Sequence, residues 1–149
     1  MNITFRQLTP DDNPAMRALY DYIYEITPHE WITRFDDGVL ETMTEKYHVF
    51  GAFHEEKLVG MGALLDRGLI SAAGVLPEYR GRGIQKKLID ARIACAAKMN
   101  LKAVVAGVHP NNAASISSLK DRGFFKAMEN KDANGDPYHV FMCRVDSKS

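Results

Sequence analysis

The segment best suited to chemistry is a short loop, Pro77 to Ile84, in which two glycines alternate with basic residues. It lies between an apolar segment, expected to be a strand, and a segment with helical spacing. Gly81 and Gly83 allow a close approach of the backbone to a ligand. The first turn of a helix also presents unpaired N–H groups. Together these features predict an anion site.

The ligand of this loop is expected to be a di- or polyphosphate with an organic tail. Each hydrogen bond to a charged group contributes about 1.5–3 kcal/mol, whereas the helix dipole contributes about 0.3–1 kcal/mol. Several converging backbone amides therefore outweigh the dipole. Local positive charge comes from Arg80, Arg82, Lys86 and Lys87.

Two familiar phosphate motifs do not fit this loop. A nucleotide P-loop needs Gly-Lys followed by Ser or Thr, but Gly83 is followed by Ile84 and Gln85. A dinucleotide fingerprint needs a third glycine, and Lys86 stands in its place. A plain turn before a helix remains the simple alternative.

Length and composition favour one domain spanning residues 1–149. The 19 basic and 19 acidic residues cancel, so net charge gives no reason to expect nucleic acid or a membrane surface as a partner. The N-terminus lacks the pattern of a signal peptide, and no apolar segment is long enough to cross a bilayer. We expect a cytoplasmic location.

Neither cysteine nor histidine spacing points to a metal. Cys95 and Cys143 form no CxxC pair and are interpreted as small buried hydrophobic residues. The histidines show no i, i+4 pairing, so we expect no metal site.

Hydrophobic periodicity predicts a series of strands and helices that would position the loop. Strands are expected at 3–8, 49–53, 58–65, 69–75, 103–108, 124–128 and 138–145, and helices at 15–24, 39–47, 82–99 and 111–122. The helix at 82–99 is expected to bury Ile84, Leu88, Ala91, Cys95 and Met99. The last residues, 146–149, are expected to be frayed.

The resulting order, β-α-α-β-β-β-α-β-α-β-β, predicts an α/β (α+β) fold. Its central sheet is expected to be mixed but mostly antiparallel, with helices flanking it.

The loop and this order of elements resemble those of the GNAT superfamily of N-acyltransferases. Residues 75–84 match the signature loop of that family, and the strand order matches along nearly all of the chain. A second match runs from Asn112 to Gly123 and Phe124, at the usual offset. The resemblance implies acyl-CoA, usually acetyl-CoA, as the donor.

The resemblance also implies which residues hold the coenzyme. Arg80 and Gly83 occupy the fixed positions of the signature, and the amides of Arg80, Gly81, Arg82, Gly83, Ile84 and Gln85 would bind the pyrophosphate. Gln85 stands where the family usually has Gly or Ala, which narrows the cradle. Asn112 would contact the pantetheine arm or a water near it.

The strand before the loop would receive the pantetheine arm. Gly74 is expected to mark a bulge that splays this strand from the strand at 103–108. The arm would enter the gap and pair with the strand. The Val75 amide would then act as an oxyanion donor to the thioester carbonyl.

The usual proton donor of the family is missing. Many relatives place a tyrosine where this chain has Leu119, and leucine has no proton to donate. Three explanations remain open. The thiolate leaves without a dedicated acid, another donor such as Tyr138 or Tyr79 substitutes, or the protein binds acyl-CoA with little turnover.

No residue stands out as the general base. His109 ends a predicted strand near the expected position of the acceptor amine, and its ordinary pKa of about 6.5 suits the role. A strand-end histidine without chemistry is the alternative. Asp66 could border the cleft, whereas Glu55 and Glu56 are expected to be solvated in a turn.

The expected activity is transfer of an acetyl group to the primary amine of a small molecule or a peptide. The alternative is an acyl-CoA-binding or regulatory module with little turnover. Trp31 and Phe35 are candidates for the acceptor side, although aromatic residues at such spacing also form cores. Because many relatives are dimers, a homodimer is left open.

Overall fold

The computed structural model describes residues 1–32 and 34–145, so the fraying expected for 146–149 lies outside the described residues. The strands are β1 (Ile3–Gln7), β2 (His48–His54), β3 (Lys57–Leu64), β4 (Ile70–Val75), β5 (Ala103–Val108), β6 (Phe125–Lys131) and β7 (Pro137–Arg144). The helices are α1 (Asn13–Ile26), α2 (Asp37–Lys46), α3 (Ile84–Lys98) and α4 (Ala113–Asp121). This order is the one that the sequence predicted.

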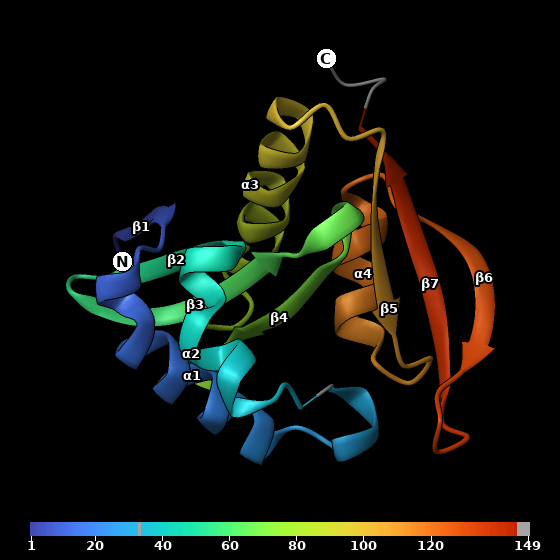
Figure 1. Ribbon diagram of the computed structural model, residues 1–149, viewed down its shortest axis with the longest axis horizontal. Coiled ribbons are helices and arrows are strands. Elements are labelled where there is room, and N and C mark those ends of the chain that lie inside the picture. Colours follow the sequence, from blue (N-terminus) through green and yellow to red (C-terminus); the bar gives the residue numbers. More distant parts are fainter. Residues whose placement is uncertain (33, 146–149) are drawn as a thin grey trace.

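The strands form two antiparallel sheets instead of one continuous sheet. Their orders are β1-β2-β3-β4 and β5-β7-β6. In the described part of the chain, the two sheets meet at one isolated parallel bridge between Leu69 and Val105. In Figure 1 the strands β5, β7 and β6 run across the direction of β2, β3 and β4 and not parallel to them. The mixed, mostly antiparallel α+β fold is therefore confirmed, with a break between β4 and β5.

Helices α1 and α3 cover opposite faces of the first sheet. A Cβ on Gly60 would lie 3.2 Å from Ile84 of α3, whereas a Cβ on Gly74 would lie 2.7 Å from Ile23 of α1. Gly74 pairs with Met61, the neighbour of Gly60, and successive residues of a strand point to opposite faces. One helix therefore lies on each side of the sheet.

The core has two parts that follow this layering. One packs α1 and α2 against β1–β4, with Tyr20, Leu40 and Val59 among its buried members. The other packs α3 and α4 against β5 and β7, with Ile89, Val104 and Phe141 among its members. Both parts also include residues of β3, β4 and α3, so the two cores meet along these elements.

The buried stripe of α3 differs from the predicted one. It comprises Ile84, Leu88, Ile89, Arg92, Ile93 and Ala96. Of the residues expected there, Ala91 and Cys95 are only half-buried and Met99 is exposed. The helix is therefore rotated toward Arg92, because it packs on two sheets at once and not on one.

The bulge predicted at Gly74 lies earlier in β4. Gly74 is in register with Met61, and the register shifts between there and the pair of Ser71 with Ala63. The extra residue is accommodated at Ala72, whose φ of 51° lies in the left-handed region. Gly74 instead allows α1 to approach closely.

We expect Gly74→Ala to lower the free energy of unfolding by about 1–3 kcal/mol, because overpacking displaces neighbouring side chains. The new Cβ would lie 2.7 Å from Ile23 Cγ2, and that side chain is buried. Urea denaturation measures the change. Gly38→Ala in α2 is the control, since no atom lies within 4 Å of its added Cβ. Equal stabilities of the two variants would contradict the close approach of α1.

Candidate functional site

A cleft of about 680 Å³ occupies the gap between β4 and β5. One wall is β4 with the following loop and the start of α3, and the other wall is β5 with α4. The end of α1 and the segment after it, including Trp31, line the mouth. The cleft thus joins the predicted loop to the second predicted motif at Asn112.

The loop forms an open cradle of backbone amides. Gly81 and Gly83 have φ values of 77° and 78°, a conformation that side chains oppose. No atom lies within 4 Å of a Cβ built on either glycine, so the constraint is conformational. The first intrahelical bond of α3 runs from Lys87 N to Gly83 O. The amides of Ile84 and Gln85 therefore have no partner within the helix.

Arg80 contributes through its side chain and not its amide. Its backbone N–H donates to Pro77 O at 3.2 Å, so that amide is unavailable to a ligand. Its Nε donates to Val75 O at 3.0 Å. The arginine therefore fixes the loop to the end of β4.

The Val75 amide points toward the gap. Leu76 N donates to Val59 O of β3 at 2.9 Å, and N–H groups alternate in direction along a strand. Val75 N–H therefore faces away from β3, toward β5. The bond from Arg80 to Val75 O agrees with this orientation. The geometry suits the predicted oxyanion donor.

The charged groups that line the cleft all carry positive charge. They are Arg80, Lys86 and Arg92, and no Asp, Glu or His belongs to the lining formed by the described residues. Lys86 is paired with the exposed Asp121 at 2.7 Å across α3 and α4. The neutral chain therefore has a cleft suited to anions.

Arg92 is the cation of the cleft lining that the sequence did not predict. Its side chain is 1% exposed, and burial lowers its pKa to about 10, so the guanidinium is charged at neutral pH. Its Nε donates to Leu88 O at 3.1 Å. An arginine among aliphatic residues at helical spacing was a weak signal, because the sequence does not reveal the rotation of α3.

Gln85 and Asn112 present side-chain amides to the cleft. Gln85 Oε1 is buried, with no hydrogen-bond partner among the described residues. Asn112 caps α4, and its Oδ1 accepts a bond from Ser115 N at 3.3 Å. Its Nδ2 is then the group that can donate to a ligand.

Leu119 lies in the cleft lining and is 5% exposed. It belongs to the core cluster beneath β5. The position of the expected phenol is therefore filled by an aliphatic side chain.

Tyr138 lies beside the cleft without belonging to its lining. A Cβ on Gly107 of β5 would lie 3.4 Å from Tyr138 Cδ2, and Gly107 does line the cleft. The absence of a side chain at Gly107 leaves the half-buried phenol ring next to β5.

His109 is 8% exposed, just beyond β5. Its Nδ1 accepts a bond from Asn111 N at 3.1 Å, so the neutral ring carries its proton on Nε2. Its ring stacks on Trp31 with centroids 6.0 Å apart, and Figure 1 shows the segment between α1 and α2 reaching toward that end of β5. In this tautomer Nε2 donates, so the predicted role as a base requires loss of the Asn111 bond.

Of the remaining candidates for proton transfer, Tyr79 lines the cleft but Asp66 does not. The Tyr79 hydroxyl is 2.8 Å from His54 Nδ1, at the cradle end of the cleft. Asp66 is exposed outside the lining, in a turn whose Gly68 approaches Ala103 O at the start of β5. The prediction that Asp66 borders the cleft is therefore wrong. Glu55 is exposed in the predicted turn.

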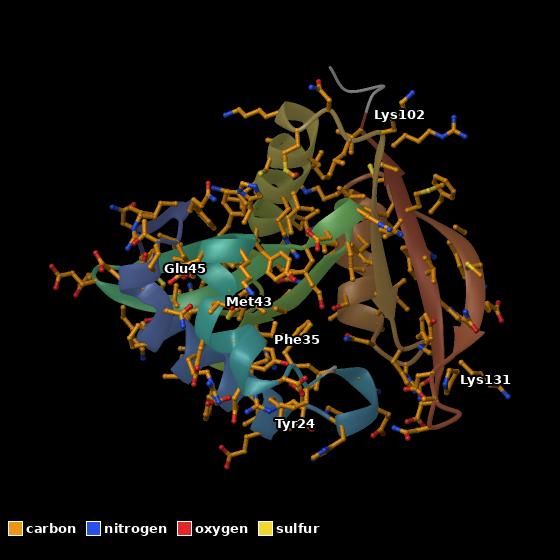
Figure 2. The ribbon with its side chains drawn as sticks, viewed as in Figure 1. Tyr24, Phe35, Met43, Glu45, Lys102 and Lys131 are labelled. Carbon is orange, nitrogen blue, oxygen red and sulfur yellow. The ribbon has the colours of Figure 1, made fainter. Side chains whose placement is uncertain are left out.

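The two aromatic candidates for the acceptor side have separate roles. Trp31 lines the cleft. Phe35 packs on the core, with its ring centroid 6.0 Å from that of Tyr20. Figure 2 labels Phe35 on the α1 and α2 side of the molecule. A lining role is thus supported for Trp31 but not for Phe35.

Neither a metal cluster nor a membrane span occurs within the described ranges. No group of three or more His, Cys, Asp or Glu residues in 1–32 and 34–145 is arranged to hold a metal ion. No helix formed by those residues has the length and apolarity needed to cross a membrane.

The family model described as the acetyltransferase (GNAT) family matches residues 7–124 of this chain. No curated protein matches the chain significantly.

Solved structures share the fold. An N-acetyltransferase from Staphylococcus aureus Mu50 has a TM-score of 0.82 and 21% identity, over 97% of this chain and 99% of that one. A ribosomal-protein-alanine N-acetyltransferase from Brucella melitensis has a TM-score of 0.78 and 22% identity, over 95% and 99%. A putative acetyltransferase from Salmonella typhimurium, solved with acetyl-CoA, has a TM-score of 0.79 and 22% identity, over 97% and 95%.

We expect Arg92→Met to raise the free energy of unfolding by about 1–3 kcal/mol, because a buried charge without a paired carboxylate is costly. The folded pKa lies below the unfolded one, so this cost is present at neutral pH and falls only as the pH rises past about 10. Thermal unfolding at pH 7 measures the change in the free energy of unfolding. The exposed Arg144 gives the control Arg144→Met, expected within about 0.5 kcal/mol. A less stable Arg92→Met would show that the guanidinium is compensated.

Proposed function

The chain belongs to the GNAT acetyltransferase family, and from that premise we propose that it transfers an acetyl group from acetyl-CoA to the primary amine of a small molecule or a peptide. The observation that carries this proposal is the cleft itself, in which a cradle of free amides opens into a gap whose charged groups are all cationic. The family match supports treating residues 1–149 as one N-acetyltransferase domain.

The cradle would hold the pyrophosphate of the coenzyme. The amides of Gly81, Arg82, Gly83, Ile84 and Gln85 would donate to it, and each bond to a charged oxygen contributes about 1.5–3 kcal/mol. Arg80 supports the cradle by tying its backbone to Val75. The helix N-terminus of α3 adds a smaller favourable term.

The gap between β4 and β5 would hold the pantetheine arm and the thioester. The arm would pair with the free edge of β4, and Asn112 would donate to it from the opposite wall. The Val75 N–H would then polarise the thioester carbonyl and stabilise the oxyanion that forms when the amine attacks.

Proton transfer would depend on groups at the open side of β5. We retain Tyr138 as the donor to the departing thiolate, because its ring lies against Gly107 in the cleft wall. His109 would position Trp31 and the start of α4 through its stacking and its bond from Asn111. It would serve as a base only after giving up that bond.

The alternative function, a module that binds acyl-CoA with little turnover, is supported by one observation. Leu119 places an aliphatic side chain in the cleft lining where many relatives have a tyrosine. Release of thiol from acetyl-CoA in the presence of a panel of amines separates the two functions. Turnover with any amine would exclude the binding-only version.

We expect Gly83→Glu to weaken the binding of acetyl-CoA and of coenzyme A at least a hundredfold, about 2.7 kcal/mol. The new carboxylate would occupy the cradle and repel the phosphates. Isothermal titration calorimetry measures both affinities.

The matched control for this variant is Gly135→Glu in the β6–β7 turn. Gly135 also has a positive φ, 85°, and open space around its added Cβ. The Gly135→Glu substitution therefore introduces the same charge and the same backbone strain away from the cradle. Unchanged affinity in Gly83→Glu would place the phosphates elsewhere, and no binding by the unmodified protein would end the proposal.

We expect Tyr138→Phe to lower kcat about tenfold or more, because general acid catalysis contributes at least that much where the leaving group needs a proton. The affinity for acetyl-CoA should stay within about twofold. A thiol-release assay and calorimetry measure the two quantities, and Tyr22→Phe at an exposed position of α1 is the control. Equal turnover of the Tyr138→Phe variant and the unmodified protein would remove Tyr138 as the acid.

A further inference from the structure

Arg92 is a buried cation that the proposed coenzyme site does not use. Its side chain is 1% exposed, and within the described residues no carboxylate lies within ion-pair distance of it. The bond from Nε to Leu88 O occupies only one of its five N–H donors. Buried charges are normally paired, so an anion that enters the cleft would supply a carboxylate partner that the described residues do not.

The guanidinium lies level with the bulge of β4. A Cβ built on Gly62 would lie 2.6 Å from Arg92 Cζ and 2.8 Å from Nη2. Gly62 stands between Met61 and Ala63, whose partners in β4 are Gly74 and Ser71. These two partners flank the bulge. Arg92 and the bulge residues Ala72 and Ala73 all line the same cleft.

This level lies farther along the sheet from the cradle than Ile84 does. A Cβ on Gly60 would contact Ile84, whereas a Cβ on Gly62 would contact the guanidinium of Arg92. Two residues of a strand span about 7 Å. Helix α3 returns along β4, since it begins at the loop where β4 ends. A ligand anchored by its phosphates at the cradle and lying along β4 therefore directs its other end toward Arg92.

We propose that Arg92 binds a carboxylate at the far end of the donor's acyl group, so that this cleft takes coenzyme A thioesters of dicarboxylic acids, of which succinyl-CoA is representative. This inference rests on the proposed function and deepens it by naming the class of acyl group. A guanidinium binds a carboxylate through two parallel hydrogen bonds. An acetyl group is too short to supply that partner.

The transfer itself keeps the same chemistry. The neutral amine nitrogen attacks the thioester carbonyl, the new C–N bond forms and the C–S bond breaks. The coenzyme leaves as a thiolate and takes up the equivalent of the proton that the amine loses. The product is an amide that retains the free carboxylate of the acyl chain.

The donor is a better source of this carboxylate than the acceptor. Arg92 belongs to α3, on the face of the first sheet opposite α1. The acceptor would enter past Trp31 and the end of α1, at the mouth of the cleft. A carboxylate on the acceptor would have to pass the thioester to reach Arg92.

The test compares the binding of coenzyme A, butyryl-CoA and succinyl-CoA by calorimetry without any amine. We expect the unmodified protein to bind succinyl-CoA at least tenfold more tightly than butyryl-CoA. This ratio should fall to about one in Arg92→Met and be partly restored in Arg92→Lys. The affinity for coenzyme A should stay within twofold in both variants, which shows that the cradle is intact.

The binding results distinguish failure of the carboxylate role of Arg92 from failure of the proposed function. If the unmodified protein binds butyryl-CoA as tightly as succinyl-CoA, the carboxylate role is overturned while the proposed function stands. A succinyl preference that persists in a folded Arg92→Met also overturns it. If the unmodified protein binds none of the three ligands, the proposed function fails as well. If Arg92→Met does not fold, the comparison of succinyl-CoA with butyryl-CoA on the unmodified protein and on Arg92→Lys decides.

A carboxylate on the acceptor is distinguished by kinetics. In that case Arg92→Lys would change kcat/KM for an amino acid but not for the corresponding decarboxylated amine, with acetyl-CoA as the donor. That result, together with equal binding of the two thioesters, would assign Arg92 to the acceptor and overturn the proposal.

Discussion

The free edge of β4 inside the molecule is the constraint on which the rest of the structure depends. Backbone N–H and C=O groups that are withdrawn from water need partners, yet β4 and β5 share only the bridge from Leu69 to Val105 among the described residues. A bulge at Ala72 also interrupts the register between β4 and β3. Arg80 satisfies the carbonyl of Val75, while the amide of that residue is left facing the gap. A ligand that brings its own amides is the natural partner of such an edge.

The cleft between β4 and β5 also concentrates positive charge. The chain as a whole is neutral, but the described lining of the cleft has cations and no carboxylates. The cradle and Arg80 lie at the end of β4, and Arg92 lies level with the bulge of this strand. This distribution of positive charge suits a long ligand that is anionic where it enters. The stability lost by burying Arg92 is of the kind that proteins sustain at functional sites.

The reacting centre is defined as much by missing groups as by present ones. Leu119 supplies no proton, and the bond from Asn111 fixes the tautomer of His109. In the proposed function, electrostatic stabilisation by the Val75 amide would then be the main contribution that the chain itself makes at the thioester. Tyr138, whose ring lies next to Gly107 of β5, would add to this stabilisation as the proposed acid.

The sequence by itself determined the order of the elements and the cradle, because both depend on local rules. Alternation and helical spacing revealed the strands and helices, and Gly81 and Gly83 are needed wherever a loop must adopt a left-handed backbone before a helix. The family resemblance followed from the same local residues, and the family match confirms it.

Only the tertiary structure decided which side chains meet across the gap. The rotation of α3 that buries Arg92 depends on packing against two sheets, and the position of the bulge at Ala72 depends on the register between β3 and β4. The proton position on His109 depends on a bond formed after β5 ends. These features arise from contacts between elements distant in the chain, which no local pattern of residues records.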